Sequence, residues 1–227
     1  MSAIGKALLS LFYPDTCPLC GKYGKGICAE CDKTLPRTEQ AEIRQNGTEM
    51  VLTDLGVRHL QRAAAYLYYD KDHPIRQLIH RIKYSDKPTI GYELGKQAAM
   101  EMQYADFFDE IDVIIPIPLH PRRLRERGYN QSEYIAKGIS EVTGIPVDTT
   151  HVIRTRNTPK QALQTGEERQ HNVADAFEVI RPEQLYRKHI LILDDLITTG
   201  ETIRSCTKAM RRIRKAQFTV FALCKAR

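Results

Sequence analysis

The chain has 227 residues, of which 42% are hydrophobic and 27% charged. This is enough for one mid-sized α/β domain with a small appendage, and it excludes a wholly disordered chain. Tryptophan is absent, which argues against a large interface anchored by that residue. The formal net charge of +6 fits anionic partners such as phosphate or nucleic acid without selecting between them.

The amino-terminal segment Ile4–Phe12 is apolar, but it is too short to span a bilayer and lacks a small-residue cleavage site. We expect it to pack on the neighbouring domain, with contact to a membrane surface as the alternative. Because no secretory signal is evident, the six cysteines indicate a reducing compartment, where metal binding is favoured over disulfides. The sequence therefore predicts a cytoplasmic protein without a transmembrane segment, associated with the inner face of the membrane if this segment contacts lipid.

Four of the cysteines form two Cys-x-x-Cys pairs, Cys17 with Cys20 and Cys28 with Cys31. Each pair can direct two thiolates at one point, and two pairs supply the closed tetrahedral shell of a structural zinc site. A redox dithiol, an iron–sulfur cluster and disulfides are the competing interpretations. Two pairs this close together favour zinc over all three.

From about Leu60 onward, the apolar pattern alternates between strand and helix periodicity. The expected strands are 63–69, 112–115, 152–155, 190–193 and 218–224. The expected helices are 74–84, 90–104, 131–143 and 201–213, with a further short helix capped by Thr165 and Glu168.

This alternation predicts an α/β fold with a mostly parallel sheet. We place it at residues 51–227, after a four-cysteine zinc module with its leading segment and linker at residues 1–50. The two remaining cysteines, Cys206 and Cys224, are expected in the core. Ligands of such sheets bind at the carboxyl ends of the strands.

The most informative motif is Ile190-Leu-Ile-Leu-Asp-Asp-Leu-Ile-Thr-Thr-Gly-Glu-Thr202. An apolar strand ends in Asp194 and Asp195, which are placed to accept hydrogen bonds from vicinal ribose hydroxyls. The backbone N–H groups of the helix that follows form an anion site, and glycine lets the chain approach a phosphate closely. A cap at Asp194 alone does not account for two adjacent carboxylates. The residues of the turn and helix start are Thr198, Thr199, Gly200 and Thr202.

The motif resembles the phosphoribosyl pyrophosphate motif of the type I phosphoribosyltransferases. The resemblance implies a type I phosphoribosyltransferase-like domain in which the turn holds the 5′-phosphate. It also implies that Mg²⁺ bridges the pyrophosphate and the ribose hydroxyls, and it assigns Asp194 and Asp195 to the catalytic centre.

Two further loops are implied by the same resemblance. The pyrophosphate loop falls at 115–123, with Arg122 and Arg123 as the basic candidates and a solvated basic loop as the alternative. A mobile lid falls at 154–161, where Lys160 would offset charge as pyrophosphate departs. Asn130 is a candidate for orienting a substrate, with an ordinary helix cap as the alternative.

Other motifs narrow the resemblance: Arg127-Gly-Tyr-Asn-Gln131, Thr158-Pro-Lys-Gln161 and Asn172-Val173. With the cysteine pairs, they are similar to the competence protein F family, including its competence protein FC members. This implies a role in bacterial natural transformation, where single-stranded DNA enters the cytoplasm. The implied partners are a DNA-translocating helicase and a DNA-processing protein. A basic run around Arg211 and Arg212 is compatible with binding of single-stranded DNA, and a solvated helix end is the alternative.

Two functions remain open from the sequence. One is a phosphoribosyl-pyrophosphate-binding protein that acts in DNA uptake by contact. The other is a Mg²⁺-dependent phosphoribosyltransferase for a base, a nucleotide or a nucleic-acid acceptor. No acceptor-binding hood is recognisable, which favours the binding protein over the enzyme. The zinc module or the helix at 75–84 is the candidate to replace such a hood.

Overall fold

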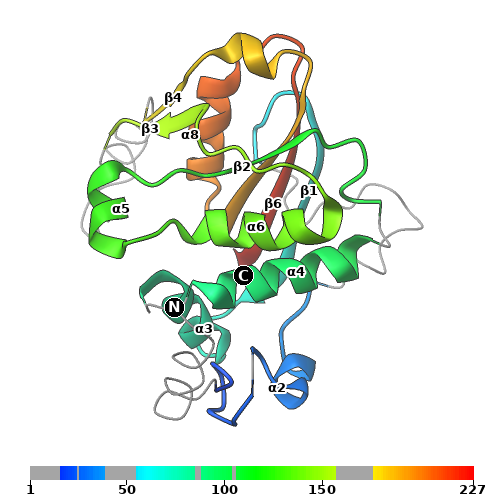
Figure 1. The fold of residues 1–227 in the computed structure, drawn as a ribbon, viewed down its shortest axis with the longest axis vertical. Coiled ribbons are helices and arrows are strands. Elements are labelled where there is room, and N and C mark those ends of the chain that lie inside the picture. The colour runs from blue at the N-terminus through cyan, green and yellow to red at the C-terminus, as the bar shows by residue number, and fades with distance from the viewer. Residues whose placement is uncertain (1–15, 25, 39–54, 85–87, 104–105, 157–175) are drawn as a thin grey trace, which may run out of the picture.

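The computed structural model describes residues 16–24, 26–38, 55–84, 88–103, 106–156 and 176–227. Its centre is a four-stranded parallel sheet, which confirms the prediction of an α/β fold with a mostly parallel sheet (Figure 1). The strands, in their order across the sheet, are β1 (Leu60–Tyr69), β6 (Gln217–Ala226), β5 (His189–Ile197) and β2 (Val113–Pro116).

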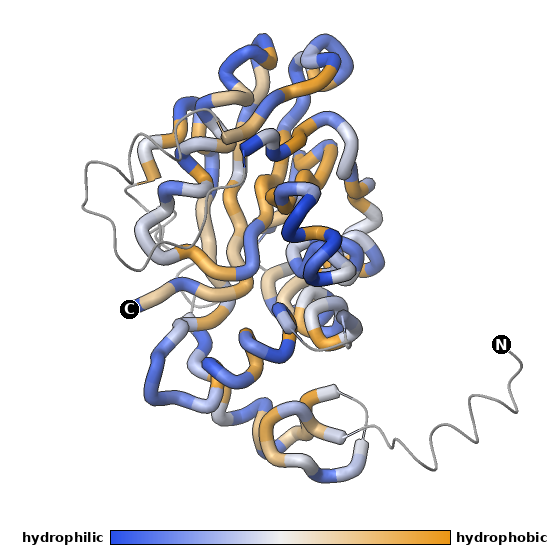
Figure 2. The backbone as a smooth tube through the Cα atoms, turned by 90° about the vertical axis from the view of Figure 1, so that its left-hand side faces the viewer, coloured by the Kyte–Doolittle hydropathy of each residue, from blue (hydrophilic) through white to orange (hydrophobic). Residues whose placement is uncertain are grey.

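The sheet is buried on both faces, as the near-continuous apolar runs of its strands require. Leu191 and Leu193 of β5 pack into the core on one face, which is covered by α3 (Ile75–Tyr84), α4 (Thr89–Gln103) and α6 (Gln131–Thr143). Ile190 and Ile192 pack into the core on the opposite face, against α8 (Glu201–Met210). Figure 2 shows the resulting pattern, with apolar strands inside and polar segments around them.

A two-stranded antiparallel sheet lies outside the main sheet and consists of β3 (Val152–Arg154) and β4 (Phe177–Val179). The strand expected at 152–155 therefore exists, but it does not join the parallel sheet. The 3₁₀ helix η2 (Pro182–Leu185) follows β4, and the small sheet and η2 contribute apolar side chains to the core beneath α8.

Close packing of α4 on α6 fixes the helical layer. An added Cβ at Gly138 would lie 2.1 Å from the carbonyl oxygen of Tyr92, and one at Gly95 would lie 2.3 Å from that of Ile135. Glycine at both positions is therefore what lets the two backbones approach. This contact sets the position of α6, whose first residues face the carboxyl edge of the sheet.

The cysteine-rich segment is tied to the main sheet through the residues that follow α2 (Ala29–Lys33). Tyr68 donates its backbone N–H to Pro36, and Thr38 donates to Tyr66, so the segment pairs with the outer edge of β1. Arg37 adds a bidentate contact to Glu101 of α4, with two nitrogen–oxygen distances of 2.8 Å.

Several predicted boundaries differ from the structure. The strand expected at 190–193 continues to Ile197, because β6 provides ladder partners as far as Lys225. The helix expected at 201–213 ends at Met210. The segment expected as an open loop at 115–123 contains the start of a helix, α5 (Pro121–Arg127), capped by the His120 side chain. The short helix expected at Thr165 lies outside the described residues.

The two cysteines predicted to lie in the core, Cys206 and Cys224, are both fully buried. Burial raises the pKa of the Cys206 thiol to about 12 and also raises that of Cys224. Both thiols are therefore protonated at neutral pH and serve as small apolar side chains.

Candidate functional site

The four amino-terminal cysteines converge on one point. The Sγ atoms of Cys17, Cys20, Cys28 and Cys31 all lie within 4.8 Å of one another, and those of Cys20 and Cys28 are 3.6 Å apart. A tetrahedral zinc ion with bonds of about 2.3 Å requires sulfur–sulfur distances of about 3.8 Å. The cluster therefore has the donor set and the spacing of a four-thiolate zinc site.

The thiols of this cluster perturb one another strongly. Burial raises the pKa of Cys17, but hydrogen bonds from backbone amides, Cys28 first, outweigh it and bring the value down to about 6. Hydrogen bonding to Cys20 raises the pKa of Cys31 to about 12. A divalent cation would remove this conflict, because it stabilises all four thiolates together.

The second candidate site begins with Asp194 and Asp195, which lie within β5 rather than at its tip. Both are buried, with exposed fractions of 8% and 4%. Strand β2 ends at Pro116, opposite Leu193, so Asp194 is the first β5 residue beyond that neighbouring strand. Because side chains alternate along a strand, the two carboxylates leave the sheet on opposite faces.

Asp195 lies on the face covered by α3 and forms an ion pair with Lys83, at 2.8 Å between Nζ and Oδ2. The two side chains are 17% and 5% exposed, so the pair is largely removed from water. Burial lowers the pKa of Lys83, but Asp195 and then Asp194 outweigh it and raise the value above its usual range. Lys83 therefore neutralises one of the two negative charges.

Asp194 accepts hydrogen bonds from the hydroxyl of Ser132 at 3.3 Å and from the backbone N–H of Asp195 at 2.9 Å. Burial and the neighbouring Asp195 raise the pKa of Asp194 to about 7. Its field also reaches Arg154 of β3: burial and Arg123 lower the pKa of that guanidinium, and Asp194 raises it. The acidic pair thus has a cation of α3 in contact with Asp195 and an arginine of β3 within the electrostatic influence of Asp194.

The turn after β5 has the shape needed for an anion cradle. Gly200 adopts a left-handed conformation, with φ of 76°, and caps α8; an added Cβ there would lie 2.8 Å from Leu55 Cδ2. Thr198 and Thr199 are exposed, and Thr202 is half-buried in the first turn of α8. The first N–H groups of a helix lack intrahelical partners and favour an anion. Arg204 donates to the carbonyl oxygen of Thr199 at 2.6 Å and holds the turn.

The two arginines predicted on the pyrophosphate loop have different surroundings. Arg122 is exposed and pairs with Glu126 along α5, at 2.9 Å. Arg123 is half-buried, and its charge lowers the pKa of Arg154, which Asp194 raises. Arg123 is thus related to Asp194 only through Arg154, whereas Arg122 pairs with Glu126, and the role of both in binding pyrophosphate stays a prediction.

Asn130 proves to be a helix cap. Its side chain accepts the backbone N–H of Ser132 at 3.1 Å and donates to the carbonyl oxygen of Ile117 at 3.0 Å. It therefore positions Ser132 against Asp194 and joins α6 to the loop after β2. Lys160, the lid residues around it and the motif at 172–173 lie outside the described residues.

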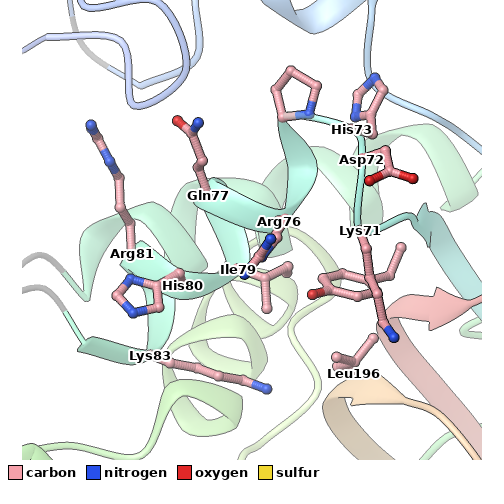
Figure 3. A pocket seen from close by; sticks show the side chains of 12 residues that line it. Lys71, Asp72, His73, Arg76, Gln77, Ile79, His80, Arg81, Lys83 and Leu196 are labelled. Carbon is pink, nitrogen blue, oxygen red and sulfur yellow. The ribbon is translucent and has the colours of Figure 1, made fainter.

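A cavity of about 710 Å³ opens beside the acidic pair (Figure 3). It is lined by Tyr69 at the end of β1, by the loop that follows, by one side of α3 and by Leu196 of β5. Lys83 lines the cavity and contacts Asp195, so the cavity and the acidic pair are adjacent.

Three residues of this site were not identified from the sequence: Lys83, Ser132 and Arg154. Lys83 is one residue beyond the last buried position of an amphipathic helix, and its pattern is that of any solvated lysine. Ser132 and Arg154 reach Asp194 only through the packing of α6 and β3. For Lys83, the available signal was its position directly after the apolar face of a helix that ends near the carboxyl ends of the strands. This signal is weak.

Within the described residues, no helix is long and apolar enough to cross a membrane.

Comparison with known proteins gives clear sequence relatives. The DNA utilization protein YhgH of Shigella flexneri is 30% identical over 208 residues, covering 88% of this chain and 90% of that protein. Competence protein F of Haemophilus influenzae is 29% identical, covering 67% of this chain and 69% of that protein. Competence protein ComFC of Bacillus subtilis is 22% identical, covering 88% of this chain and 73% of that protein. No protein-family model matches the chain.

Solved structures align over about three fifths of the chain. Glutamine phosphoribosylpyrophosphate amidotransferase from B. subtilis, complexed with ADP and GMP, aligns with a TM-score of 0.43 and 22% identity, covering 64% of this chain and 30% of that one. An adenine phosphoribosyltransferase aligns with a TM-score of 0.41 and 14% identity, covering 61% of this chain and 71% of that one. Assignment to a family rests on the sequence relatives. The chain belongs to the family of DNA utilization protein YhgH, competence protein F and ComFC.

Proposed function

We propose that this chain binds phosphoribosyl pyrophosphate together with Mg²⁺ at the carboxyl edge of β5. The observation that carries the proposal is the buried pair Asp194 and Asp195, followed within five residues by the Thr198–Gly200 turn that opens α8. Carboxylates suit ribose hydroxyls and a hard divalent cation, and a helix start suits a phosphate. One short segment therefore offers groups for both ends of a phosphoribosyl ligand.

The cations around the acidic pair support the same ligand. Lys83 forms an ion pair with Asp195, and Asp194 raises the pKa of Arg154, so cations from two different elements lie near the pair. Two carboxylates do not by themselves attract a pyrophosphate, but this surrounding positive charge offsets them. When bound, Mg²⁺ would neutralise pyrophosphate oxygens, and Asp194 and Asp195 are the carboxylates that would hold it with the ribose.

The ligand proposal is tested by thermal unfolding. Phosphoribosyl pyrophosphate with Mg²⁺ should raise the unfolding midpoint, because a ligand that binds the native state stabilises it. Thr199→Tyr should abolish the rise by filling the turn, whereas Thr150→Tyr, an exposed threonine at another site, should leave it intact. A midpoint that does not respond in the parent protein would contradict the proposal.

We further propose that the protein acts in the handling of single-stranded DNA during natural transformation, at the cytoplasmic side of the membrane. Support comes from the names of its relatives, which are a DNA utilization protein and competence proteins. The implied helicase and DNA-processing partners belong to this proposal, as does zinc in the cysteine module.

The basic run after α8 offers a place for DNA. Arg211 and Arg212 are exposed and follow the last turn of α8, whose first turn lies at Gly200. A helix of ten residues is about 15 Å long. This run therefore lies near the amino ends of the strands, whereas the Thr198–Gly200 turn (hereafter the phosphate turn) lies at their carboxyl ends. Charge reversal at Arg211 and Arg212 should therefore weaken salt-sensitive binding of single-stranded DNA and leave the phosphoribosyl pyrophosphate response unchanged. Binding that is insensitive to both salt and charge reversal would contradict this assignment.

An active phosphoribosyltransferase is the second candidate, and the cavity beside Lys83 is the observation that favours it. An acceptor in that cavity would lie next to the acidic pair. Release of pyrophosphate from labelled phosphoribosyl pyrophosphate, in the presence of bases, nucleosides, nucleotides or single-stranded DNA, tests this function. Release by the parent but not by Thr199→Tyr would establish it.

A further inference from the structure

The cavity between β1 and α3 combines an apolar wall with a cationic rim. Tyr69, Ile79 and Leu196 provide aromatic and aliphatic surface, and Ile79 is almost fully buried. A surface of this kind suits the flat faces of a ring better than it suits a small hydrated ion. The volume of about 710 Å³ is also far larger than a single phosphate group needs.

The charged residues of the lining are predominantly basic. Among the described residues of the lining, Asp72 is the one acidic residue, against four basic residues that are positively charged at neutral pH. These four are Lys71, Arg76, Arg81 and Lys83. Lys71 and Arg76 are exposed, and neither makes an ion pair with another residue in the described part of the chain. Their charge is therefore available to a ligand.

Two lysines of the lining relate the cavity to the acidic pair. In Figure 3, the side chains of Lys71 and Lys83 extend toward Leu196. Lys83 also contacts Asp195, at 2.8 Å. Lys83 therefore lies between the cavity and the acidic pair.

From this geometry we infer that the cavity is a second binding site, which takes a nucleoside 5′-phosphate. The base would lie against the apolar wall, and the phosphate would contact Lys71 and Arg76. A free nucleotide and the phosphorylated 5′ end of a DNA strand share this chemistry. The inference rests on the proposed function only for the identity of the ligand that binds next to the cavity. The cavity itself and the phosphate turn are formed by different residues.

The test measures the affinity of thymidine 5′-monophosphate by calorimetry, with the full chain. The parent should bind it, and thymidine without the phosphate should bind at least about tenfold more weakly, since two charge-assisted contacts are lost. Lys71→Met combined with Arg76→Met should lower the affinity for thymidine 5′-monophosphate by a similar factor. Arg187→Met combined with Lys188→Met removes the same charge at the amino edge of the sheet and should change the affinity less than about twofold.

Thr199→Tyr separates the two sites. It should abolish the response to phosphoribosyl pyrophosphate and leave thymidine 5′-monophosphate bound, whereas the Lys71/Arg76 variant should do the reverse. Thymidine 5′-monophosphate binding that is lost in Thr199→Tyr and kept in the Lys71/Arg76 variant would place the nucleotide in the phosphate turn and overturn the inference. A Lys71/Arg76 variant that loses both responses would overturn it as well.

The remaining arms distinguish the two sources of the phosphate. A 5′-phosphorylated oligothymidine that competes with thymidine 5′-monophosphate, while its 5′-hydroxyl counterpart does not, identifies a DNA end as the ligand. Competition by neither identifies the free nucleotide. A parent protein that responds to phosphoribosyl pyrophosphate but not to thymidine 5′-monophosphate refutes this inference alone. The opposite result refutes the proposed function and leaves the cavity site standing.

Discussion

Asp194 and Asp195 are neighbours in sequence, but the alternation of β5 gives each carboxylate a different environment. Asp195 is neutralised by Lys83, and Asp194 relies on a hydroxyl and a backbone N–H. A hydroxyl offsets a buried charge less than an ammonium group does, so Asp194 is the member of the pair that holds a proton near neutral pH. Occupation of the site by a cation would favour its deprotonated form.

The first prediction concerns the pH dependence of stability. Because the pKa of Asp194 is raised from 3.8 to about 7, the folded protein holds a proton there between those values and the unfolded chain does not. This contribution to stability is present at low pH and is lost as the pH rises toward and through 7. Asp194→Asn removes it. The free energy of unfolding of the parent, relative to that of Asp194→Asn, should therefore fall between pH 5 and pH 8 in urea titrations.

The neighbouring charges of Asp195, Lys83 and Arg154 are the same in both proteins, so the difference isolates Asp194. A difference that is constant across this range, or that grows with pH, would show that the pKa of Asp194 is not raised.

The second prediction concerns Lys83. Lys83→Met should destabilise the protein by about 3 kcal/mol at pH 7, because it leaves the Asp195 carboxylate buried without its cation. Adding Asp195→Asn should recover most of that loss. Lys96→Met removes an ion pair that is more exposed, with Glu141, and should cost less than about 1 kcal/mol. Equal losses for Lys83→Met and Lys96→Met in urea unfolding would contradict a buried pair.

At the scale of elements, the contact between α4 and α6 determines where the start of α6 lies. Gly138 and Gly95 allow the two backbones to touch, and Ser132 and Asn130 at the start of α6 then reach β5 and the loop after β2. Helix packing far from the sheet edge thus contributes to the geometry of the acidic pair.

Gly138→Ala should destabilise the protein by about 2 kcal/mol or more. The new methyl group would meet backbone, which cannot move aside as a side chain can. Gly91→Ala is the matched control on α4: its nearest contact is a side-chain atom of Ile135 at 3.4 Å, and alanine favours the helix. Gly91→Ala should be nearly neutral in the same urea titration, and a Gly138→Ala variant as stable as the parent would refute the close contact.

We expect the cysteine module to depend on a metal, because it buries few apolar side chains, with Cys17 and Leu35 as buried members. Purified protein should contain one zinc ion. Chelation, or a single Cys28→Ser substitution, should increase amide exchange in residues 16–38 and weaken their pairing with β1. Exchange in β5 should change little. Protein without zinc, or exchange that is unaffected by chelation, would contradict this account.

The sequence predicted the elements that have strong periodicity, and it placed α6 at the residues where the structure has it. It placed the acidic pair at a strand tip because the apolar run stops at Leu193, whereas pairing with β6 continues β5 to Ile197. The sequence did not predict α5, because the histidine that caps this helix, His120, lies among prolines and such a pattern is typical of a loop. Lys83 was missed because an ion pair between distant elements leaves no local pattern.

At the scale of the whole molecule, the carboxyl edge of the sheet carries the acidic pair, the phosphate turn and the cavity. The basic run around Arg211 lies at the opposite edge. The cysteine module joins the outer edge of β1 through Arg37 and its neighbours. The cysteine module therefore meets β1 just before Tyr69, which lines the cavity, whereas the basic run lies at the other end of the strands.

The central claim is that Asp194, Asp195 and the turn after them bind phosphoribosyl pyrophosphate. Asparagine at both positions removes the two charges while it keeps the side-chain shape and an oxygen that Lys83 can contact, so it disturbs the fold less than alanine would. Calorimetric titration of Asp194→Asn/Asp195→Asn with phosphoribosyl pyrophosphate and Mg²⁺, beside the parent, is the most direct measurement, with circular dichroism confirming the fold. The account predicts binding by the parent and at least a hundredfold loss in the variant, or about 2.7 kcal/mol. A folded variant that binds the ligand as tightly as the parent would contradict it.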